Sequence, residues 1–390
     1  MPVLQDIMMS TQRHFDRVVE MLELRIGLVG PLPPPSGGMA NQTRQLAGLL
    51  RAAGAEVSLV QVNAPYKPAW AGRLQGVRAL FRLVPYVWML WRTAGKVRLF
   101  HVMANSGWSW HLFAAPAIWI GWLRGVRVIV NYRGGEAEEF FSRSFRWIRP
   151  SLGKVTTIIV PSGFLADVFN HRGVATRIVP NIVNLNRFTV GKRHVYTRGD
   201  AGPHLLVTRN LEPIYDIDTA LRVLQQLRES FPEATMTVCG SGPERKRLEA
   251  LAQTLEIASA VVFTGRLDNE QVAGLYPSAD VLVNPSLADN MPNSVLEALA
   301  SGVPVVSTRV GGVPYLVQHE KTALLVPPGD VDAMAKAITR VLESPELAAH
   351  LVTAGLAEIQ QYTWSNVREQ LQSVYMDALM ETGNTEAPGK

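Results

Sequence analysis

The feature that most constrains this sequence is an alternation of short β-branched runs with longer helical patterns, and the alternation occurs twice along the chain. Such alternation favours parallel sheets whose strands are connected by crossover helices. The first series predicts strands at 25–30, 56–62, 98–103, 126–131 and 156–160, with a helix at about 39–53. The second predicts strands at 204–208, 234–239, 260–263, 280–284 and 303–307, and helices at 217–230, 243–255, 269–276, 293–301 and 331–343. The prediction is an α/β chain with two Rossmann-like sheets in tandem.

The stretch between the two series marks a domain boundary. Residues 181–203 lose periodicity and gather Asn, Gly, Arg and Pro, which is typical of a connection between domains. In open α/β sheets ligands bind at the carboxyl ends of the strands, so we expect the two domains to face each other across a cleft. The predicted organisation is an extension at 1–23, a first domain at 24–185, a linker at 186–203, a second domain at 204–360, a final helix at 361–380 and a disordered tail at 381–390.

Composition excludes several classes of protein. The chain is 47% hydrophobic and 18% charged, which indicates a globular fold. Its single cysteine, Cys239, excludes a disulfide framework and a multi-cysteine metal site, and it fits a reducing cytoplasm. Four acidic residues interrupt the first 23 positions, so we expect no secretory signal there. The apolar stretch 108–123 is shorter than the roughly 20 residues of a spanning helix, so a buried helix is expected.

Charge is distributed unevenly between the two halves. Residues 1–180 carry 21 Lys and Arg against 9 Asp and Glu, whereas residues 181–390 carry 17 against 24. Between positions 57 and 135 there is no acidic residue, but there are ten basic ones and seven tryptophans. This combination suits an anionic membrane surface, which attracts each nearby Lys or Arg by about 1 kcal/mol. A nucleic acid is the alternative, but the acidic second half and the lack of a known module argue against it.

Two carboxylates and a helix start follow the predicted strand 280–284. Asn293 or Ser294 is placed to cap the next helix, whose free amides and dipole would hold an anion such as a diphosphate. Asp289 lies in the loop before that helix and Glu297 lies one turn inside it, so both could flank one ligand. The alternative is that Asp289 is a turn residue and Glu297 an exposed helix charge.

Three further candidates follow strands. Arg209 comes directly after the strand 204–208, where its guanidinium suits phosphate oxygens; a surface ion pair is the alternative. Arg133 and Glu136 follow the strand 126–131 and are candidates for substrate contact, unless they form a local ion pair. Gly37 and Gly38 would let backbone amides approach a charged ligand, although an ordinary turn also fits. The dinucleotide fingerprint and the Walker loop are absent.

A metal site is not expected. Asp216 and Asp218 form an acidic doublet, but the doublet stands where a helix begins, and helix capping accounts for it. No other Asp or His cluster has the spacing of metal ligands.

Taken together, these motifs resemble the retaining family-4 glycosyltransferases of the GT-B fold, over about residues 24–379. The most specific part is an E-x7-E type motif, present as Asp289 and Glu297 and followed by Ala-Leu-Ala-Ser-Gly-Val-Pro. Supporting pieces are the Gly37-Gly38 loop and the segments 160–162, 179–188, 263–266, 311–314 and 362–364.

The resemblance implies a role for each motif. The second domain would bind a nucleoside-diphosphate sugar and the first domain the acceptor, while the final helix would cross back onto the first domain. Arg209 would neutralise the diphosphate, Glu297 would bind the donor ribose, and Asp289 would meet the sugar. The expected catalytic residues are Arg209, Asp289, Glu297 and Arg133. The expected donor-binding residues are Gly37, Gly38, Tyr215, Gly240, Gly265, Arg266, Leu267, Asn290, Met291, Pro292, Asn293 and Ser294.

The sequence departs from the family pattern at three of these positions. Asp289 stands where the family has Glu, Tyr215 where it has Lys, and Arg133 where a His is usual. The first change shortens the reach to the sugar, and the second removes a charge from the diphosphate site. A cation at Arg133 or Arg266 could replace that charge.

The resemblance implies a retaining, metal-independent hexosyltransferase, and the basic, tryptophan-rich first domain leads us to expect it at the cytoplasmic face of a membrane. It would act on a lipid-linked or polysaccharide acceptor in cell-surface or exopolysaccharide synthesis, without a cofactor, since the nucleotide sugar is a co-substrate. Alternatives are a nucleotide-sugar epimerase of the same fold and a non-catalytic partner subunit. A Rossmann dehydrogenase is disfavoured because its fingerprint is missing.

Overall fold

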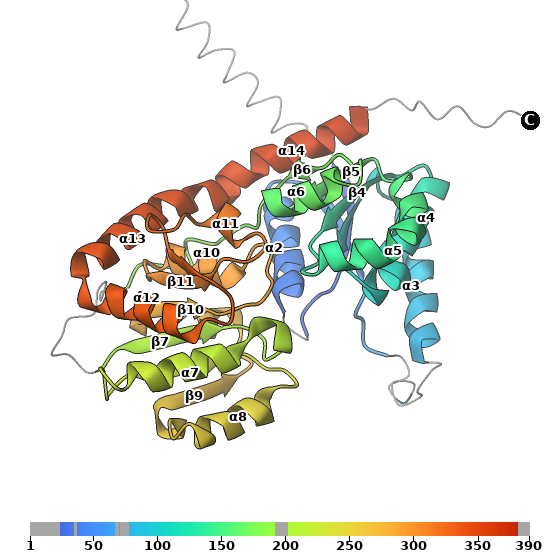
Figure 1. Ribbon diagram of the computed structural model, residues 1–390. Coiled ribbons are helices and arrows are strands. Elements are labelled where there is room, and N and C mark those ends of the chain that lie inside the picture. The colour runs from blue at the N-terminus through green and yellow to red at the C-terminus, as the bar shows by residue number, and fades with distance from the viewer. Residues whose placement is uncertain (1–23, 35–36, 67–69, 71–77, 192–201, 381–390) are drawn as a thin grey trace, which may run out of the picture. The chain divides into compact units, whose positions relative to one another are not determined.

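The computed structural model describes residues 24–34, 37–66, 70, 78–191 and 202–380 (Figure 1). The predicted extension at 1–23, the tail at 381–390 and the linker positions 192–201 lie outside the described residues. Contacts divide the chain into two compact units. Unit 1 contains the described residues up to Pro161, Val168–Val179 and the chain from Arg368; unit 2 contains Ser162–Asp167 and Pro180–Val367.

Unit 1 is built on a six-stranded parallel sheet with the order β2-β1-β3-β4-β5-β6. All six residues of β3 are buried, so this central strand is covered on both faces. The strands are β1 (Arg25–Gly30), β2 (Glu56–Gln61), β3 (Leu99–Ala104), β4 (Arg127–Tyr132), β5 (Thr157–Val160) and β6 (Arg177–Ile178).

Helices cover both faces of this sheet. A Cβ on Gly121 in α4 would lie 2.4 Å from Val128 and 3.2 Å from Phe100, so α4 packs directly on the strands. The next residue of β3, His101, points to the opposite face, where it contacts Tyr375 of α14. The helices are α2 (Gly38–Ala52), α3 (Arg78–Ala94), α4 (Ala115–Leu123), α5 (Ala137–Leu152), α6 (Gly163–Asn170) and α14 (Trp364–Met380), with a π-helical turn η2 (Trp110–Ala114) before α4.

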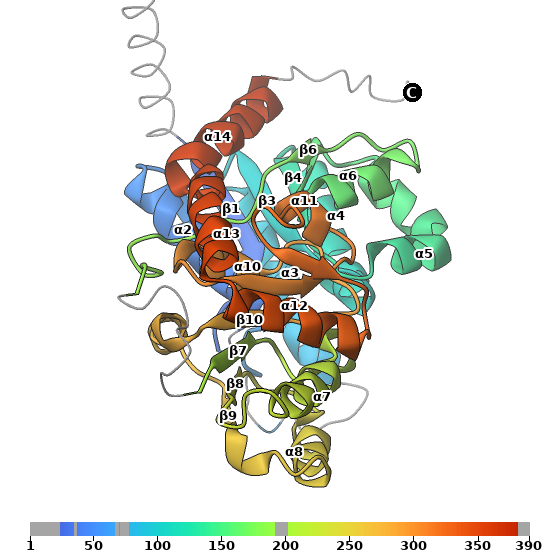
Figure 2. The same ribbon diagram turned by 60° about the vertical axis from the view of Figure 1, so that its left-hand side comes forward.

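Unit 2 repeats the design with the strand order β12-β11-β10-β7-β8-β9. Helices α7 and α12 pack against each other over a buried aliphatic core, and Figure 2 shows α7 and α8 beside β7, β8 and β9. The strands are β7 (His204–Thr208), β8 (Thr235–Cys239), β9 (Val261–Gly265), β10 (Val281–Asn284), β11 (Val305–Thr308) and β12 (Leu324–Val326). The helices are α7 (Ile217–Leu227), α8 (Arg245–Thr254), α9 (Asn269–Ala273), α10 (Asn293–Ala300), α11 (Val313–Leu316), α12 (Val331–Glu343) and α13 (Pro345–Glu358). Short turns are η3 (Pro213–Tyr215), η4 (Ala258–Ala260), η5 (Tyr276–Ser278) and η6 (Ile359–Tyr362).

The predicted α/β fold with two parallel sheets is confirmed. The strand 204–208 and the helix 331–343 have the predicted bounds. The helix predicted at 269–276 ends at Ala273, because Gly274 follows and a separate turn begins at Tyr276. The apolar stretch 108–123 forms η2 and α4, and no helix among the described residues is long and apolar enough to cross a membrane.

The last helix returns the chain to unit 1. From Arg368 onward α14 belongs to that unit, where Asp377 forms an ion pair with Arg177 and Tyr375 contacts the central strand. The C-terminal helix predicted from the resemblance is therefore present.

Candidate active site

The candidate site in unit 2 begins at the carboxyl end of β7, with Arg209. Gly240 follows the neighbouring strand β8 and lies very close to the Arg209 backbone. A Cβ on Gly240 would lie 1.9 Å from the Arg209 carbonyl oxygen. Gly240 also has a φ of 158°, so glycine is required here on two grounds. Its N–H donates to the carbonyl of Gly265, 3.0 Å away, at the end of β9. The ends of β7, β8 and β9 are thus joined at one place.

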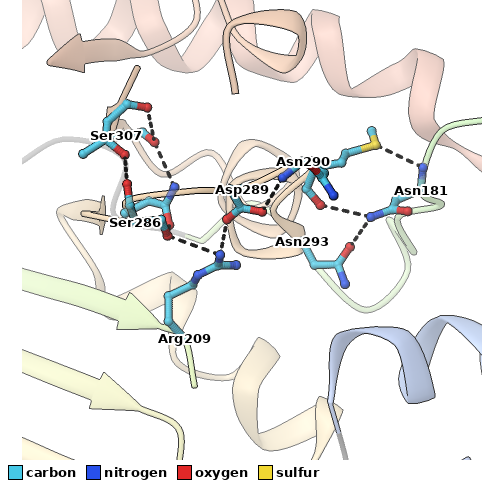
Figure 3. Close-up of polar contacts among 10 residues, drawn as sticks. Asn181, Arg209, Ser286, Asp289, Asn290, Asn293 and Ser307 are labelled. Atoms are coloured by element: carbon cyan, nitrogen blue, oxygen red, sulfur yellow. Dashed lines mark hydrogen bonds and ion pairs between the residues drawn. The ribbon is translucent and has the colours of Figure 1, made fainter. Parts of the chain in front are cut away.

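The Arg209 guanidinium lies between the Tyr215 ring and a polar loop; Figure 3 shows its contacts with Ser286 and Asp289 of that loop. Its carbon stands 4.1 Å from the centroid of the Tyr215 ring. One nitrogen donates to Ser286 Oγ at 3.2 Å and forms an ion pair with Asp289. The two charged side chains are only 11% and 12% exposed, so the surface ion pair considered above is wrong. Arg209 Nε is buried without a hydrogen-bond partner among the described residues.

Asp289 is therefore more than a turn residue. Burial raises the pKa of its carboxyl, while the Arg209 guanidinium and the Asn290 N–H oppose the shift. That N–H donates to Asp289 Oδ1 at 3.0 Å. The Asp289 carbonyl accepts the Gly312 N–H at 2.8 Å, and a Cβ on Gly312 would lie 1.8 Å from the Asn290 carbonyl oxygen. Gly311 and Gly312, the glycines of the segment 311–314, thus fix the backbone of this loop.

A series of hydrogen bonds between buried polar side chains supports the loop that carries Ser286 and Asp289 (Figure 3). Ser286 Oγ donates to Asn284 Oδ1 at 3.0 Å, and Asn284 Nδ2 donates to Ser307 Oγ at 2.9 Å. Thr308 Oγ1 donates to the Ser286 carbonyl at 2.6 Å. Because all four side chains are fully buried and bonded, they hold Ser286 in place toward Arg209.

The start of α10 differs from the prediction. The residue before the helix is Pro292, which makes no side-chain capping bond, so neither Asn293 nor Ser294 is the cap. The Asn293 side chain instead accepts a hydrogen bond from Asn181 Nδ2 at 2.8 Å. Asn181 Nδ2 also donates to the Met291 carbonyl at 3.1 Å. Ser294 lies within the first turn, and its buried hydroxyl has no hydrogen-bond partner among the described residues.

Glu297 faces inward, so the alternative of an exposed helix charge is wrong. Tyr276 donates to Glu297 Oε2 at 2.8 Å and shares a hydrogen bond of 2.9 Å with Thr208 Oγ1. Burial raises the pKa of Glu297 to about 7, although Tyr276 and Arg209 oppose the shift. The carboxylate is thus held one turn inside α10, close to the end of β7.

Three other expected donor residues follow at this edge of unit 2. Gly265 ends β9 with a φ of 73°, and Arg266 and Leu267 follow it, exposed and half-buried respectively. The structure therefore gathers, at the carboxyl ends of β7 to β10, the residues Arg209, Tyr215, Gly240, Gly265, Asp289, Asn290, Met291, Asn293, Ser294 and Glu297.

The remaining candidates belong to unit 1. Gly38 is the first residue of α2, and a Cβ on Gly37 would meet nothing within 4 Å. Arg133 follows β4, where its Nε donates to Asn131 Oδ1 at 3.0 Å, and burial lowers the pKa of its guanidinium to about 10. Glu136 is exposed. Whether Gly38 and Arg133 serve the same ligand as Arg209 stays a prediction.

A chain of neutral groups supports Arg133. Asn131 presents its oxygen to Arg133, so its Nδ2 donates to His101 Nε2 at 3.0 Å. The other ring nitrogen therefore carries the proton and donates to Tyr375 Oη at 2.8 Å. Burial lowers the pKa of His101 to about 3, which keeps the ring neutral.

Sequence reasoning missed several of these residues. No motif marks Tyr276, His101 or Tyr375, because their partners lie on other elements of the fold. Asn181 stands in a segment that supported the resemblance, but the segment alone suggested no role for it. Among the described residues, no group of three or more His, Cys, Asp and Glu side chains could hold a metal ion.

Comparison with known proteins gives two family models, which together match most of the chain. The model described as Glycosyltransferase Family 4 matches residues 36–187, and the one described as Glycosyl transferases group 1 matches residues 193–357.

Curated relatives match over part of their length. The chain is 32% identical over 231 residues to the D-inositol 3-phosphate glycosyltransferase of Acidothermus cellulolyticus, covering 56% of this chain and 51% of the relative. It is 34% identical over 170 residues to the GDP-mannose-dependent α-(1-6)-phosphatidylinositol monomannoside mannosyltransferase of Mycolicibacterium smegmatis, covering 42% and 44%. The chain thus spans about half the length of these relatives.

A solved structure extends the similarity to the whole fold. The sucrose-phosphate synthase of Thermosynechococcus elongatus superposes with a TM-score of 0.70 at 24% identity. The superposition covers 91% of this chain and 99% of that one.

Proposed function

Because this chain belongs to the family-4 glycosyltransferases of the GT-B fold, we propose that it moves a sugar from a nucleoside-diphosphate sugar to a lipid-linked or polysaccharide acceptor. The observation that carries the proposal is the buried cluster of Arg209, Asp289 and Glu297 at the strand ends of unit 2. We further propose that the anomeric configuration is retained, that no metal is needed, and that the reaction occurs at the cytoplasmic face of a membrane.

Arg209 has the central role in this proposal. When the sugar leaves, negative charge gathers on the diphosphate, and a cation already fixed in a water-poor site stabilises that charge without reorganising. Arg209 is held by Ser286 and by the Tyr215 ring. Its buried Nε–H has no partner among the described residues, so it could donate a hydrogen bond to a phosphate oxygen. The amino end of α10 would add its dipole from the side of Asn293.

The two carboxylates would position the donor. Glu297, oriented by Tyr276, would accept hydrogen bonds from the ribose hydroxyls. Asp289 would meet the sugar together with backbone amides between Asn290 and Ser294. In a same-face mechanism the departing phosphate oxygen takes the acceptor's proton, so no side chain of this cluster must act as a base.

The residues of unit 1 would act from the acceptor side. Gly38 would bring a backbone amide to the phosphates, and Arg133 would supply a second cation. The second cation matters because Tyr215 stands at the position of the family's lysine. The curated relative that acts on a phosphatidylinositol mannoside supports a lipid-linked acceptor.

Incubation of the full-length protein with radiolabelled uridine, guanosine and adenosine diphosphate sugars and extracted lipid acceptors tests this proposal. We expect one donor to raise the melting temperature and to deliver label to the lipid fraction. Arg209→Ala should abolish delivery, whereas Arg222→Ala, at an exposed ion pair of the same unit, should not. Free sugar formed without acceptor would identify an epimerase. Absence of binding to every donor would indicate a non-catalytic partner subunit.

A further inference from the structure

The amino edge of the unit 1 sheet, where its strands begin, carries a row of arginines. The Arg98 N–H donates to the Arg25 carbonyl at 3.0 Å, and the Arg127 N–H donates to the Arg98 carbonyl at 3.2 Å. The three residues therefore stand side by side at the starts of β1, β3 and β4. Glu56, in register with Arg25, is the one acidic residue that begins a strand of this sheet.

More positive charge reaches the same edge from the helices. A crossover helix runs antiparallel to the strands, so it ends near the point where the next strand begins. Lys96, Arg124 and Lys154 follow the ends of α3, α4 and α5. Within the described part of the chain, none of these three side chains forms an ion pair. Their charges are therefore available to an anionic partner.

Exposed tryptophans accompany these cations on neighbouring helices. Trp88 and Trp91 of α3 are 61% and 48% exposed, and Trp122 of α4 is 40% exposed. A cation lies over each ring: Arg92 is 5.4 Å from Trp88, Arg124 is 4.6 Å from Trp91, and Lys154 is 4.0 Å from Trp122. The second and third contacts join α3 to the end of α4 and α4 to the end of α5. We call these six residues the Trp–cation surface.

Aliphatic side chains extend this surface. Val84 and Val87 of α3 and Leu123 of α4 are all exposed. Several large apolar groups exposed together on adjacent helices are unusual for a surface that meets only water. Interleaved rings, aliphatic groups and cations match the interface of a bilayer, where rings lie at the headgroup level and cations meet phosphates.

We propose that the Trp–cation surface docks unit 1 on an anionic lipid bilayer. This inference specifies the membrane partner in the proposed function, but it does not depend on the transfer chemistry. The aliphatic groups favour lipid over nucleic acid, because a phosphate backbone offers nothing apolar to Val84 or Leu123. The surface lies at the edge where strands begin, whereas Gly38 and Arg133 lie where strands end. Docking should therefore leave the candidate ligand edge of unit 1 accessible.

Sedimentation of the full-length protein with vesicles tests this inference. One set contains phosphatidylcholine with 40% phosphatidylglycerol, at about 0.1 M salt, and the other contains phosphatidylcholine alone. We expect binding to the anionic set that weakens as salt rises. Arg92→Gln, Arg124→Gln and Lys154→Gln combined should weaken it about 100-fold, since each lost charge near the surface lowers affinity about fivefold. Trp88→Ser with Trp91→Ser should weaken binding to the same vesicles independently of salt.

The matched control removes three exposed arginines from unit 2, with Arg222→Gln, Arg247→Gln and Arg340→Gln. It changes the net charge equally and should bind vesicles like the unaltered protein. Should the triple variant of unit 1 unfold, Arg124→Gln alone should still cost about fivefold. Equal binding to neutral vesicles, or unchanged binding by the unit 1 variants, would overturn the proposal. So would tight binding of a labelled single-stranded RNA that is lost in these variants while vesicles are ignored.

Donor binding separates this proposal from the proposed function. The unit 1 variants should bind a nucleotide sugar like the unaltered protein, because no residue of the surface belongs to the candidate active site. A protein that binds anionic vesicles but no nucleotide sugar would contradict the proposed function and leave the docking surface supported.

Discussion

The two units each hold an arginine at the end of a parallel strand, but they hold it by different means. Arg209 in unit 2 is paired with a carboxylate, Asp289, and covered by the Tyr215 ring. Arg133 in unit 1 is oriented by the amide of Asn131, which rests on the neutral His101. Charge compensation fixes the first and a directional chain of neutral hydrogen bonds fixes the second. The comparison predicts that the two sites respond differently to substitution and to pH.

The largest effect should follow from removing the carboxylate in unit 2. Asp289→Asn leaves the buried Arg209 charge uncompensated, and breaking a buried pair from one side costs about 3–5 kcal/mol of unfolding free energy. Urea denaturation measures this loss. Asp218→Asn, which removes a more exposed partner of Arg222, is the control and should cost under about 1 kcal/mol. Equal losses in the two variants would contradict the role given to the buried pair.

A smaller loss is expected from the neutral chain in unit 1. Tyr375→Phe removes the acceptor of the buried His101 N–H, and an unsatisfied buried donor costs about 1–3 kcal/mol. The exposed Tyr315, changed to Phe, is the control and should stay within about 0.5 kcal/mol. If Tyr375 acts through Arg133 as well, the variant should lower kcat while the KM for the donor stays within about twofold. A variant as stable as the unaltered protein would exclude the hydrogen-bond chain.

The pH dependence should have opposite signs in the two units. Burial raises the pKa of Glu297 to about 7, so its contribution to stability falls as pH rises from about 4.5 to 7. Burial lowers the pKa of His101 to about 3, so its contribution falls as pH drops below about 6.5. Glu297→Gln should reduce the loss of stability between about pH 4.5 and pH 7. His101→Gln should reduce the loss of stability below about pH 6.5. Urea midpoints between pH 4 and pH 8 measure both, and a loss unchanged in its own variant would refute that assignment.

The smallest effect concerns the aromatic cover of Arg209. Tyr215→Leu keeps an apolar group but loses the cation–π contact, which is worth about 0.5–2 kcal/mol. We expect a loss at the lower end of that range in a thermal melt. Tyr215→Lys would restore the family's charge but place it beside Arg209, so its stability should fall further. A more stable Lys variant would show that the ring has no stabilising role.

The sequence predicted the fold well because the fold depends on local periodicity. Strands such as β7 and helices such as α12 are long and regular enough to be read from one segment. Short elements were missed, including β6, which has two residues and depends on its pairing with β5. Helix α13 begins only two residues after α12 ends, so periodicity alone gave it no separate prediction.

The charged residues of the candidate site could be predicted from the sequence, but the residues that hydrogen-bond to them could not. Arg209, Asp289 and Glu297 are visible as motif positions, and the structure places them together with Tyr276. Tyr276 itself could not be found, because it meets Glu297, 21 positions later, only once the turn η5 and helix α10 have packed together. The prediction that Asn293 caps α10 was wrong for the same reason. Asn181, which is distant in sequence, donates a hydrogen bond to the Asn293 side chain.

In the proposed function, Arg209 and the start of α10 hold a diphosphate. Calorimetric titration of the full-length protein and of Arg209→Ala with a nucleoside, its monophosphate and its diphosphate tests this most directly. We expect affinity to rise with each phosphate in the unaltered protein, and we expect the rise from monophosphate to diphosphate to disappear in the variant. A variant that keeps the full preference for the diphosphate would contradict it.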